Sequence, residues 1–403
     1  MPDLPKDLLG GLVVLDFTRV LAGPYCTRLM ADLGARIIKV ERPVQGDDTR
    51  AFYLQLEDGR TDQSSYFVRF NAGKESIAID LANPEAKGVV MDLARKADVL
   101  IENFVPGVMA RHGLDYAAVS AANPSIVYCS ISGYGQTGPL RDRPAFAHLI
   151  NAASGAMDVD RQGSPEPRVA YMQSADALAG VHAFGLVLAA VNRRQRTGQG
   201  AYLDVSMLQS LWGAEDIGIA AAINGGEFTR GPRPGMIIHP VKGEYLAVQF
   251  IGGGTTWDRL LAAMGPQGPA GAERFSTPQG RRDRWPELRQ VICDWLDGFP
   301  SVDKAMEALT AAKVPCAPVE AIEDVLAHPH MEEREAFTTI PHPGRGTVRV
   351  TSAPFHIDGK AVHARGAAPY RAGEDTRTVL GQTLGYPEER IDALLRSGAV
   401  AIP

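Results

Sequence analysis

Gly11-Leu-Val-Val-Leu-Asp-Phe17 is the stretch that decides the fold, because it is a continuous apolar run of strand length. A short loop follows it and leads into a helix opened by Pro24, a residue type favoured at the first helical position. The next apolar run, Arg36-Ile-Ile-Lys-Val-Glu41, again has the length of a strand. Strands that alternate with helices in this way indicate a parallel sheet.

The same alternation continues along the N-terminal half of the chain. Further strands are expected at 76–81, 98–104, 126–132 and 201–205, and helices at 83–97, 116–122 and 177–191. We therefore predict an α/β fold with a doubly wound, Rossmann-like large domain, whose ligands bind beyond the carboxyl ends of the strands. The residues directly after the strands are the candidate ligand contacts, and they lie at 18–23, Arg42, 103–107 and 133–135.

Length and composition leave room for a second domain. The chain has 403 residues, of which 45% are hydrophobic and 22% charged, as is typical of globular proteins. Residues 224–238 are rich in Gly, Pro and Arg and suggest a linker. We expect a large domain over 1–223, a smaller α+β domain over 224–325, and a C-terminal segment, 326–403, that returns to the large domain.

Charge and cysteine content argue against several classes of partner. The net charge of −6 and the lack of any basic run argue against nucleic acid and anionic membranes. The four cysteines lie far apart without ligand spacing, which argues against a disulfide framework and a metal site. The N-terminus shows no signal-peptide pattern, and the apolar stretch at 178–191 is too short to span a bilayer, so we expect a cytoplasmic protein.

A single carboxylate stands at the start of the long apolar helix. The segment Ser174-Ala-Asp-Ala-Leu-Ala-Gly180 places Asp176 in the expected first turn, pointing into the protein. One interpretation is a helix N-cap, since Asp is a favoured capping residue. The other is a nucleophile that the electropositive helix end keeps ionised. The two interpretations do not exclude each other.

The common nucleotide-binding and metal-binding motifs are absent. The turn Thr18-Arg-Val-Leu-Ala-Gly-Pro24 has a single glycine, and no P-loop, nucleophile-elbow or zinc-protease motif occurs. Guanidinium groups clustered near strand ends nevertheless predict a ligand with phosphates. Phe104 beside them either stacks on a base or belongs to the core. The clustered arginines are Arg19, Arg42, Arg50 and Arg111.

Nine ordered blocks of the sequence resemble the class III CoA-transferases, the CaiB/BaiF group that includes formyl-CoA transferase. Each block is weak alone, but together they are specific and cover almost the whole chain. The resemblance implies an acyl-CoA:carboxylate CoA-transferase that works as an interlocked homodimer. It implies no permanently bound cofactor and no metal, since coenzyme A and its thioesters are the substrates. The blocks are 14–24, 33–41, 46–50, 71–77, 99–107, 133–139, 196–200, 204–207 and 314–318.

Within this resemblance, Asp176 and Gly180 match the family's D-x-x-x-G sequence, so Asp176 is expected to be the catalytic nucleophile. The resemblance implies that this carboxylate attacks the acyl-CoA thioester and that the reaction passes through an aspartyl-CoA thioester, which an incoming carboxylic acid opens. Succinyl-CoA or another short dicarboxyl-CoA is the expected donor. The implied coenzyme A contacts are Arg19, Val20, Ala22, Arg42, Ile79, Asn103, Phe104, Arg111 and Met207.

The chain departs from formyl-CoA transferase at two places. Leu21 stands where that enzyme has a Gln, and the segment Thr229-Arg-Gly-Pro-Arg-Pro-Gly235 replaces its glycine-rich loop. Formate and oxalate are therefore not the expected substrates. An arginine of the replacing loop, Arg230 or Arg233, either meets the second carboxylate of a dicarboxylic acid or belongs to a plain linker.

An α-methylacyl-CoA racemase-like epimerase is the alternative, because that enzyme shares the fold and uses an Asp together with a His. Phe146 stands where the racemase has its His, and His148 is expected to face another side of a helix. Racemisation would then lack its second proton-transfer group. A non-catalytic protein that binds coenzyme A is a third class, and it would keep that affinity without turnover when Asp176 is neutralised.

Overall fold

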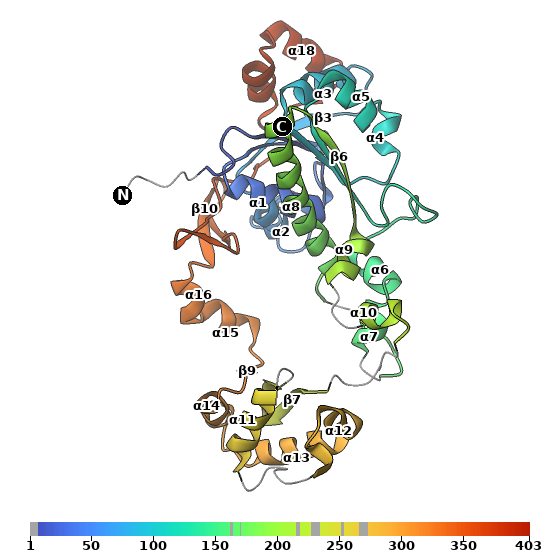
Figure 1. Cartoon of the computed structure of the whole chain (residues 1–403). Helices are drawn as coiled ribbons and strands as arrows, with labels where there is room; N and C mark the ends of the chain where they lie inside the picture. The colour runs from blue at the N-terminus through green and yellow to red at the C-terminus, as the bar shows by residue number, and fades with distance from the viewer. Residues whose placement is uncertain are drawn as a thin grey trace. The chain divides into compact units, whose positions relative to one another are not determined.

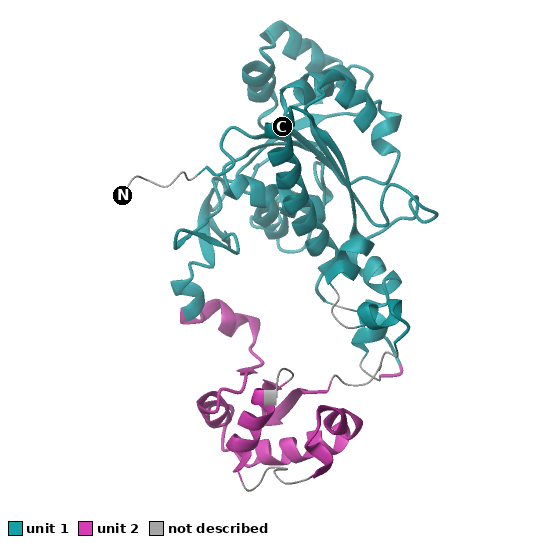
Figure 2. Ribbon diagram, viewed as in Figure 1, with its two compact units in different colours: residues 1–161, 166–228, 330–403 teal, residues 162–165, 229–329 magenta. Residues whose placement is uncertain are grey.

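The computed structural model describes residues 7–161, 164–169, 171–214, 218–226, 234–250, 254–265 and 273–403. The chain divides into two compact units (Figure 2). Unit 1 comprises residues 1–161, 166–228 and 330–403, and unit 2 comprises residues 162–165 and 229–329. The chain therefore leaves unit 1 after residue 228 and is part of it again from residue 330.

A sheet forms the centre of unit 1, and its seven strands in the described part of the chain have the order β14-β3-β2-β1-β4-β5-β6. Neighbouring strands pair in parallel, except that β14 runs antiparallel to β3. The order reverses between β1 and β4, which is the switch point where open α/β sheets bind ligands. The predicted α/β fold with a parallel sheet is confirmed. The strands are β1 (Val13–Asp16), β2 (Arg36–Glu41), β3 (Lys74–Ile79), β4 (Val99–Glu102), β5 (Val127–Ser132), β6 (Ala201–Ser206) and β14 (Val400–Ala401).

Helices cover both faces of this sheet (Figure 1). Successive strand residues point to opposite sides, so Val14 packs into one core and its neighbour Leu15 into the other. The sheet is buried on both faces, which explains why its strands are continuous apolar runs. On the side of Val14 lie α1 (Ala22–Asp32) and α8 (Ser174–Thr197), and on the side of Leu15 lie α3 (Ala86–Lys96), α5 (Tyr116–Ala122) and α18 (Glu388–Arg396).

Helix α8 is longer than the expected apolar stretch. It has 24 residues with a mean hydropathy of 1.6 in its most apolar window, so length and composition alone would let it cross a membrane, and the prediction of too short a stretch is wrong. Its packing gives it another role. Ala175, Ala179, Ala183 and Val187 recur at helical spacing and are buried against the sheet and α1, so one face of α8 belongs to the core of unit 1. Of its most apolar window, 39% is buried.

The remaining elements of unit 1 are short helices and strands outside the central sheet. Helix α1 begins at Ala22, so Pro24 lies in its first turn rather than at its first position. The other elements are η1 (Asp48–Ala51), α2 (Ser65–Asn71), α4 (Val108–Arg111), α6 (Ala147–Ala153), α7 (Ala156–Asp160), α9 (Met207–Ala214), α10 (Gly218–Ile223), α16 (Pro329–Glu333), β10 (Phe337–His342), β11 (Gly346–Thr351), β12 (His356–Ile357), β13 (Lys360–Ala361), α17 (Thr376–Thr378) and a π-helix (Val379–Thr383).

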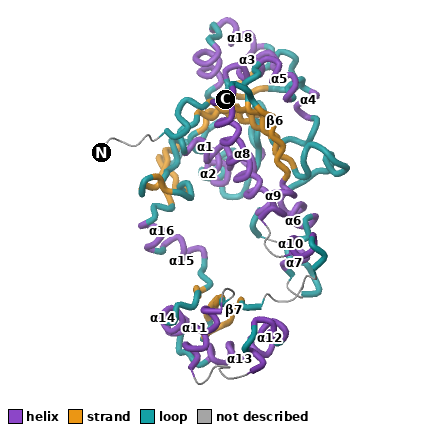
Figure 3. The backbone as a smooth tube through the Cα atoms, in the orientation of Figure 1, coloured by secondary structure: helices purple, strands orange, loops and turns teal. Residues whose placement is uncertain are grey.

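Unit 2 contains both helices and strands (Figure 3) and has its own hydrophobic core. Three antiparallel strands pair in the order β7-β8-β9, and the helices beside them bury Trp257, Phe275, Trp285 and Trp295. The elements are β7 (Met236–Val241), β8 (Glu244–Gln249), α11 (Gly254–Met264), η3 (Glu273–Phe275), α12 (Pro278–Asp283), α13 (Trp285–Asp297), α14 (Val302–Ala311), β9 (Cys316–Pro318) and α15 (Ile322–Ala327).

A glycine lets α1 and α8 approach closely. A Cβ atom added at Gly180 of α8 would lie 2.5 Å from the backbone carbonyl oxygen of Ala22, where α1 begins. Backbone atoms cannot give way as a flexible side chain can, so this contact excludes any larger residue without moving a helix. Gly180 is one turn after Asp176 on the same face of α8, so the close approach also sets the distance from α1 to that carboxylate.

Gly180→Ala is expected to destabilise unit 1 by about 1–3 kcal/mol, because overpacking forces the two helices apart. Urea unfolding followed by circular dichroism measures this free energy. Gly88→Ala in α3 is the matched control, since nothing lies within 4 Å of a Cβ atom added there. That variant should be more stable by about 0.5–1 kcal/mol, because alanine loses less backbone entropy in a helix than glycine does. Equal effects at both sites would contradict the packing argument.

Candidate active site

A cavity of about 720 Å³ lies at the carboxyl edge of the central sheet, entirely within unit 1. Its volume falls in the usual range for small-molecule sites. Residues from the ends of β1, β2, β3, β4 and β5 converge on it, because the carboxyl ends of parallel strands meet at one edge. Nine of the ten site residues expected from the sequence line it: Arg19, Val20, Ala22, Arg42, Ile79, Asn103, Phe104, Asp176 and Met207.

The loops after β1 and β4 are joined by one side chain. The amide nitrogen of Asn103 donates to the carbonyl of Arg19 at 2.7 Å, and its oxygen accepts from the backbone N–H of Arg19 at 2.8 Å. The next residue, Phe104, is held by its own N–H, which donates to buried Glu102 at 2.8 Å. Both sides of the switch point are therefore fixed by hydrogen bonds and not only by packing.

The cavity has a positively charged wall. Arg19 lies over the ring of Phe104, with 4.8 Å between the guanidinium carbon and the ring centroid. Asp48 forms ion pairs with Arg42 and, at 3.6 Å, with Arg19. Burial and the neighbouring Arg42 lower the pKa of Arg19, but an arginine stays protonated at neutral pH. This wall is suited to phosphate groups, which guanidinium binds by paired hydrogen bonds.

Two arginines of the cavity were not expected from the sequence. Arg141 and Arg143 come from the loop after β5 and also line the cavity. The sequence feature that could have indicated them is the run Leu140-Arg-Asp-Arg-Pro144, which places two positive charges shortly after the strand-end glycines at 133–135. The prediction covered only the few residues directly after each strand, so it did not include Arg141 and Arg143.

Asp176 does not cap its own helix. Helix α8 begins at Ser174 after Gln173, whose side chain forms no capping hydrogen bond, so Asp176 is the third residue of the helix. Its Oδ1 atom accepts from the N–H of Ala22 at 3.3 Å, and the N–H of Ala147 also donates to the carboxylate. The N-cap interpretation is therefore wrong. The partners of this carboxylate are the first residues of two other helices, α1 and α6.

The electrostatics of Asp176 are those of a poorly solvated carboxylate. The side chain is buried, and burial raises its pKa to about 6, while the N–H groups of Ala22 and Ala147 and the charge of His148 oppose this rise. At neutral pH the group is mostly ionised, yet it is hydrated far less than a surface carboxylate. Such a group is a stronger nucleophile than a fully hydrated one.

The charge of His148 acts on Asp176 and lowers the pKa of that carboxylate. Phe146 lines the cavity and His148 does not, so the two side chains do not share a face, but helical spacing is not the reason. Helix α6 begins at Ala147, and Phe146 precedes it in extended backbone, so helical periodicity does not relate Phe146 to His148. The Nδ1 atom of His148 is buried without a hydrogen-bond partner among the described residues.

Two expected phosphate contacts are placed elsewhere. Arg111 is exposed at the end of α4 and does not line the cavity, although its neighbour His112 does. Arg50 is buried, where it forms hydrogen bonds of 2.8 and 2.6 Å with both oxygens of Glu41 and lies over the ring of Phe67. Its inclusion in the phosphate cluster is therefore wrong, because its charge is already matched.

Across the described ranges, no group of three or more His, Cys, Asp or Glu side chains is arranged to hold a metal ion. The glycine-rich stretch Gly252-Gly-Gly254 and the arginines of the 229–235 loop lie largely outside the described residues. The fold and this cavity together define an α/β protein in which arginine side chains and one buried carboxylate line a cavity at the carboxyl edge of a parallel sheet.

The comparisons with known proteins agree on one family. A profile described as CoA-transferase family III matches residues 9–376. The chain is 33% identical over 351 residues to a succinate–glutarate CoA-transferase of Agrobacterium fabrum, covering 83% of this chain and 86% of that protein. It is 29% identical over 418 residues to a formyl-CoA:oxalate CoA-transferase of Streptomyces coelicolor, covering 97% and 99%. A crystal structure of a CaiB/BaiF family protein from Brucella suis has a TM-score of 0.78 at 27% identity, covering 94% of this chain and 99% of that one.

The chain belongs to CoA-transferase family III and is an enzyme of that class. The resemblance inferred from the nine sequence blocks is confirmed. The epimerase alternative is not favoured, since both of these relatives are named CoA-transferases.

Arg42→Gln is expected to weaken coenzyme A binding about tenfold, since a hydrogen bond to a charged group is worth roughly 1.5–3 kcal/mol and about 1.4 kcal/mol corresponds to tenfold. Isothermal titration with coenzyme A measures the change. Arg95→Gln in α3 is the matched control, because Arg95 is also exposed and paired with an Asp but does not line the cavity. Equal affinities for both variants would show that Arg42 makes no contact with the ligand.

Proposed function

We propose that this enzyme moves coenzyme A from an acyl-CoA donor to a carboxylic acid acceptor, with Asp176 as the covalent nucleophile. The observation that carries the proposal is the position of this buried carboxylate, which lines an arginine-walled cavity of nucleotide size and accepts two backbone N–H groups. Coenzyme A enters and leaves as part of the substrates. No resident cofactor is needed for the exchange.

The chemistry proceeds by acyl transfer to and from one carboxylate. An oxygen of Asp176 attacks the thioester carbonyl of the donor, the carbon–sulfur bond breaks, and coenzyme A thiolate leaves an acyl-aspartyl anhydride behind. The thiolate attacks the aspartyl carbonyl, which releases the donor acid and gives an aspartyl-CoA thioester. The acceptor carboxylate opens this thioester to a new anhydride, and the thiolate then attacks the acceptor's carbonyl. The new acyl-CoA departs and Asp176 is regenerated.

The surroundings of Asp176 suit each of these steps. The N–H groups of Ala22 and Ala147 stabilise the negative charge on the carboxylate and on the oxyanion that forms when it is attacked. We assign the phosphate groups of coenzyme A to Arg19 and Arg42, and the adenine to the face of Phe104. Arg111 remains a proposed contact for the outer part of the ligand.

The acid substrates are proposed to be short dicarboxylates, with succinyl-CoA or a similar dicarboxyl-CoA as donor. The relative from Agrobacterium fabrum is named for succinate and glutarate, which supports this choice. Leu21, where formyl-CoA transferase has a Gln, is buried and offers only a hydrocarbon side chain, so it supplies no hydrogen bond to a small polar acid such as formate or oxalate.

We further propose a homodimer with interlocked chains, located in the cytoplasm. Unit 1 carries exposed apolar side chains on α6, α8, α9 and α10, more than isolated surface residues of a monomer account for. They are Leu149, Val181, Leu186, Trp212 and Ile223. The cytoplasmic location is proposed from the sequence alone, which shows no signal-peptide pattern. Sedimentation velocity tests the dimer, since one chain has a mass of 43.2 kDa.

Incubation with succinyl-CoA is expected to leave a coenzyme A-sized adduct on the peptide that contains Asp176, because the aspartyl-CoA thioester is covalent. Intact and peptide mass spectrometry detect it. Asp176→Ala should carry no adduct and lose at least about 10³-fold in kcat, since removing a nucleophile leaves only binding and electrostatic effects. An adduct on another residue, or an active Asp176→Ala enzyme, would overturn the assignment.

The rate should fall on the acid side of about pH 6, because Asp176 attacks as the carboxylate and its pKa is raised to about 6. Below that pH, kcat/KM is expected to drop about tenfold per pH unit as the nucleophile is protonated. A pH profile in a constant-ionic-strength buffer tests this. An acid limb of the pH profile near the ordinary Asp pKa of about 4 would mean that the nucleophile is well hydrated or is another group.

A further inference from the structure

The loop after β1 holds an unusual backbone conformation at the edge of the cavity. Val20 has a φ of 69°, in the left-handed region that β-branched residues rarely occupy. Such a conformation costs about 1–3 kcal/mol and persists only where its surroundings determine it. Val20 is flanked by Arg19 and Leu21, and Ala22 begins α1, so the turn at Val20 decides where these residues point.

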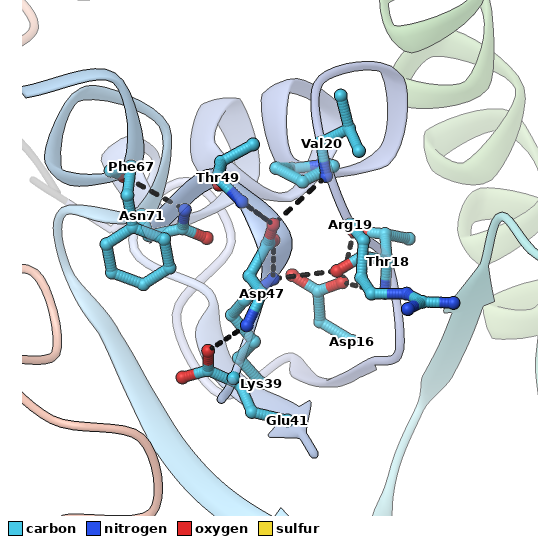
Figure 4. A network of polar contacts seen from close by, with 12 residues as sticks. Asp16, Thr18, Arg19, Val20, Lys39, Glu41, Asp47, Thr49, Phe67 and Asn71 are labelled. Carbon is cyan, nitrogen blue, oxygen red and sulfur yellow. Dashed lines mark hydrogen bonds and ion pairs between the residues drawn. The ribbon is translucent and has the colours of Figure 1, made fainter. Parts of the chain in front are cut away.

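A buried ion pair holds this turn on both sides of Arg19 (Figure 4). The Nζ atom of Lys39 donates to the carbonyl of Thr18 at 2.7 Å and to Oδ2 of Asp47 at 3.0 Å. The Oδ1 atom of Asp47 accepts from the N–H of Val20 at 3.4 Å. Lys39 and Asp47 are each at most 1% exposed, and neither lines the cavity. Lys39 and Asp47 can therefore affect the ligand site only through the position of the loop.

The ion pair belongs to a larger group of buried charges. Asp16 accepts from the N–H of Thr18 at 2.9 Å and pairs with Lys74 at 3.1 Å. Glu41 accepts from the N–H of Asp47 at 2.8 Å and pairs with Arg50. Three acids and three bases thus balance one another beneath the loop. Burying charges in this way contributes little net stability, because desolvation offsets the attraction.

The loop positions two groups at the proposed reaction site. Its Arg19 side chain lines the cavity above Phe104, and the N–H of Ala22 donates to Asp176. If the turn at Val20 relaxed to an ordinary φ, both groups would move away together. The charges beneath the loop are therefore better explained by the geometry they impose than by the stability they supply.

We infer that Lys39 and Asp47 are positioning residues, which fix the left-handed turn at Val20 so that Arg19 reaches the acyl-CoA ligand and the Ala22 N–H reaches Asp176. The inference rests on the proposed role of Asp176 as nucleophile. It extends that role to two residues that touch neither substrate nor reacting atoms.

Asp47→Asn keeps the size of the side chain and one acceptor oxygen but removes the charge that holds Lys39. The KM for the acyl-CoA donor should rise about tenfold as Arg19 moves, by the same reasoning as for a single charged contact. The acid limb of kcat/KM should move up by about one pH unit, because Asp176 loses a hydrogen bond to its charged form.

The direction of the pH shift is diagnostic. Removal of the negative charge of Asp47 would by itself lower the pKa of a nearby carboxyl, so an upward shift reports the displaced N–H and not the lost charge. Among the described residues, the other titratable groups that interact with Asp176 are His148 of α6 and Tyr66 of α2, and neither forms a hydrogen bond with Asp47. The measurement is the pH profile of kcat/KM together with KM at pH 7.5.

Asp32→Asn is the matched control. Asp32 forms an equally buried ion pair with Arg28 at 2.8 Å, but it lies at the far end of α1 from Ala22. This variant should unfold at a lower urea concentration without moving the pH profile or KM. Should Asp47→Asn fail to fold, Val20→Pro gives the second test, because proline fixes φ near −65° and leaves all six charges untouched. It should produce the same rise in KM and the same upward shift.

If the Asp47→Asn and Val20→Pro enzymes both fold and both show the wild-type KM and pH profile, the inference is wrong. The buried charges then have only a structural role. Asp176→Ala measured in parallel separates this result from a failure of the proposed function. If the Asp176→Ala enzyme is active, Asp176 is not the nucleophile and the proposed function fails. If it is inactive while Asp47→Asn keeps the wild-type kinetics, only the positioning role is wrong.

Discussion

The contact between α1 and α8 is the constraint on which the active site depends. Because Gly180 has no side chain, the carbonyl of Ala22 can sit against α8, and the N–H of the same residue then points at Asp176 one turn earlier. The loop that enters α1 also carries Arg19 into the cavity. One helix–helix contact therefore sets the position of Asp176 relative to one of its two hydrogen-bond donors and to the positive wall.

The sheet supports this arrangement with charges where parallel sheets usually have apolar side chains. Lys39, Glu41 and Lys74 lie on strands β2 and β3 and are each at most 5% exposed. Together with Asp16, Asp47 and Arg50 they carry no net formal charge, so the group neither attracts nor repels a polyanionic ligand strongly. Their hydrogen bonds and ion pairs hold a loop whose backbone would otherwise relax. This agrees with the general need for catalytic groups to be held in place by supporting residues.

Periodicity and strand-end position were enough to predict the parallel sheet and the cavity residues at 18–23, Arg42 and 103–107, because strand ends converge at one edge. Ile79 and Met207 were expected only from the family resemblance. Three features lay beyond that reasoning. Arg50 is sequestered by Glu41, a pairing that depends on how the chain folds back between them. Helix α8 begins at Ser174, which removes the N-cap interpretation of Asp176, and helix α6 begins only after Phe146; sequence patterns locate helix starts poorly. Arg141 and Arg143 reach the cavity from a loop whose path no periodicity specifies.

The antiparallel strand β14 has a consequence for how the enzyme is made. Ala401 pairs with Ala78, and Asp375 accepts from the N–H of Ser76, so the outer edge of β3 is covered by residues translated after all of unit 2. Until then the nascent chain presents an open strand edge, which is a template for pairing with other chains. Residues 229–329 are thus synthesised while unit 1 is unfinished, and chaperone protection of that edge during translation should influence the yield of active enzyme.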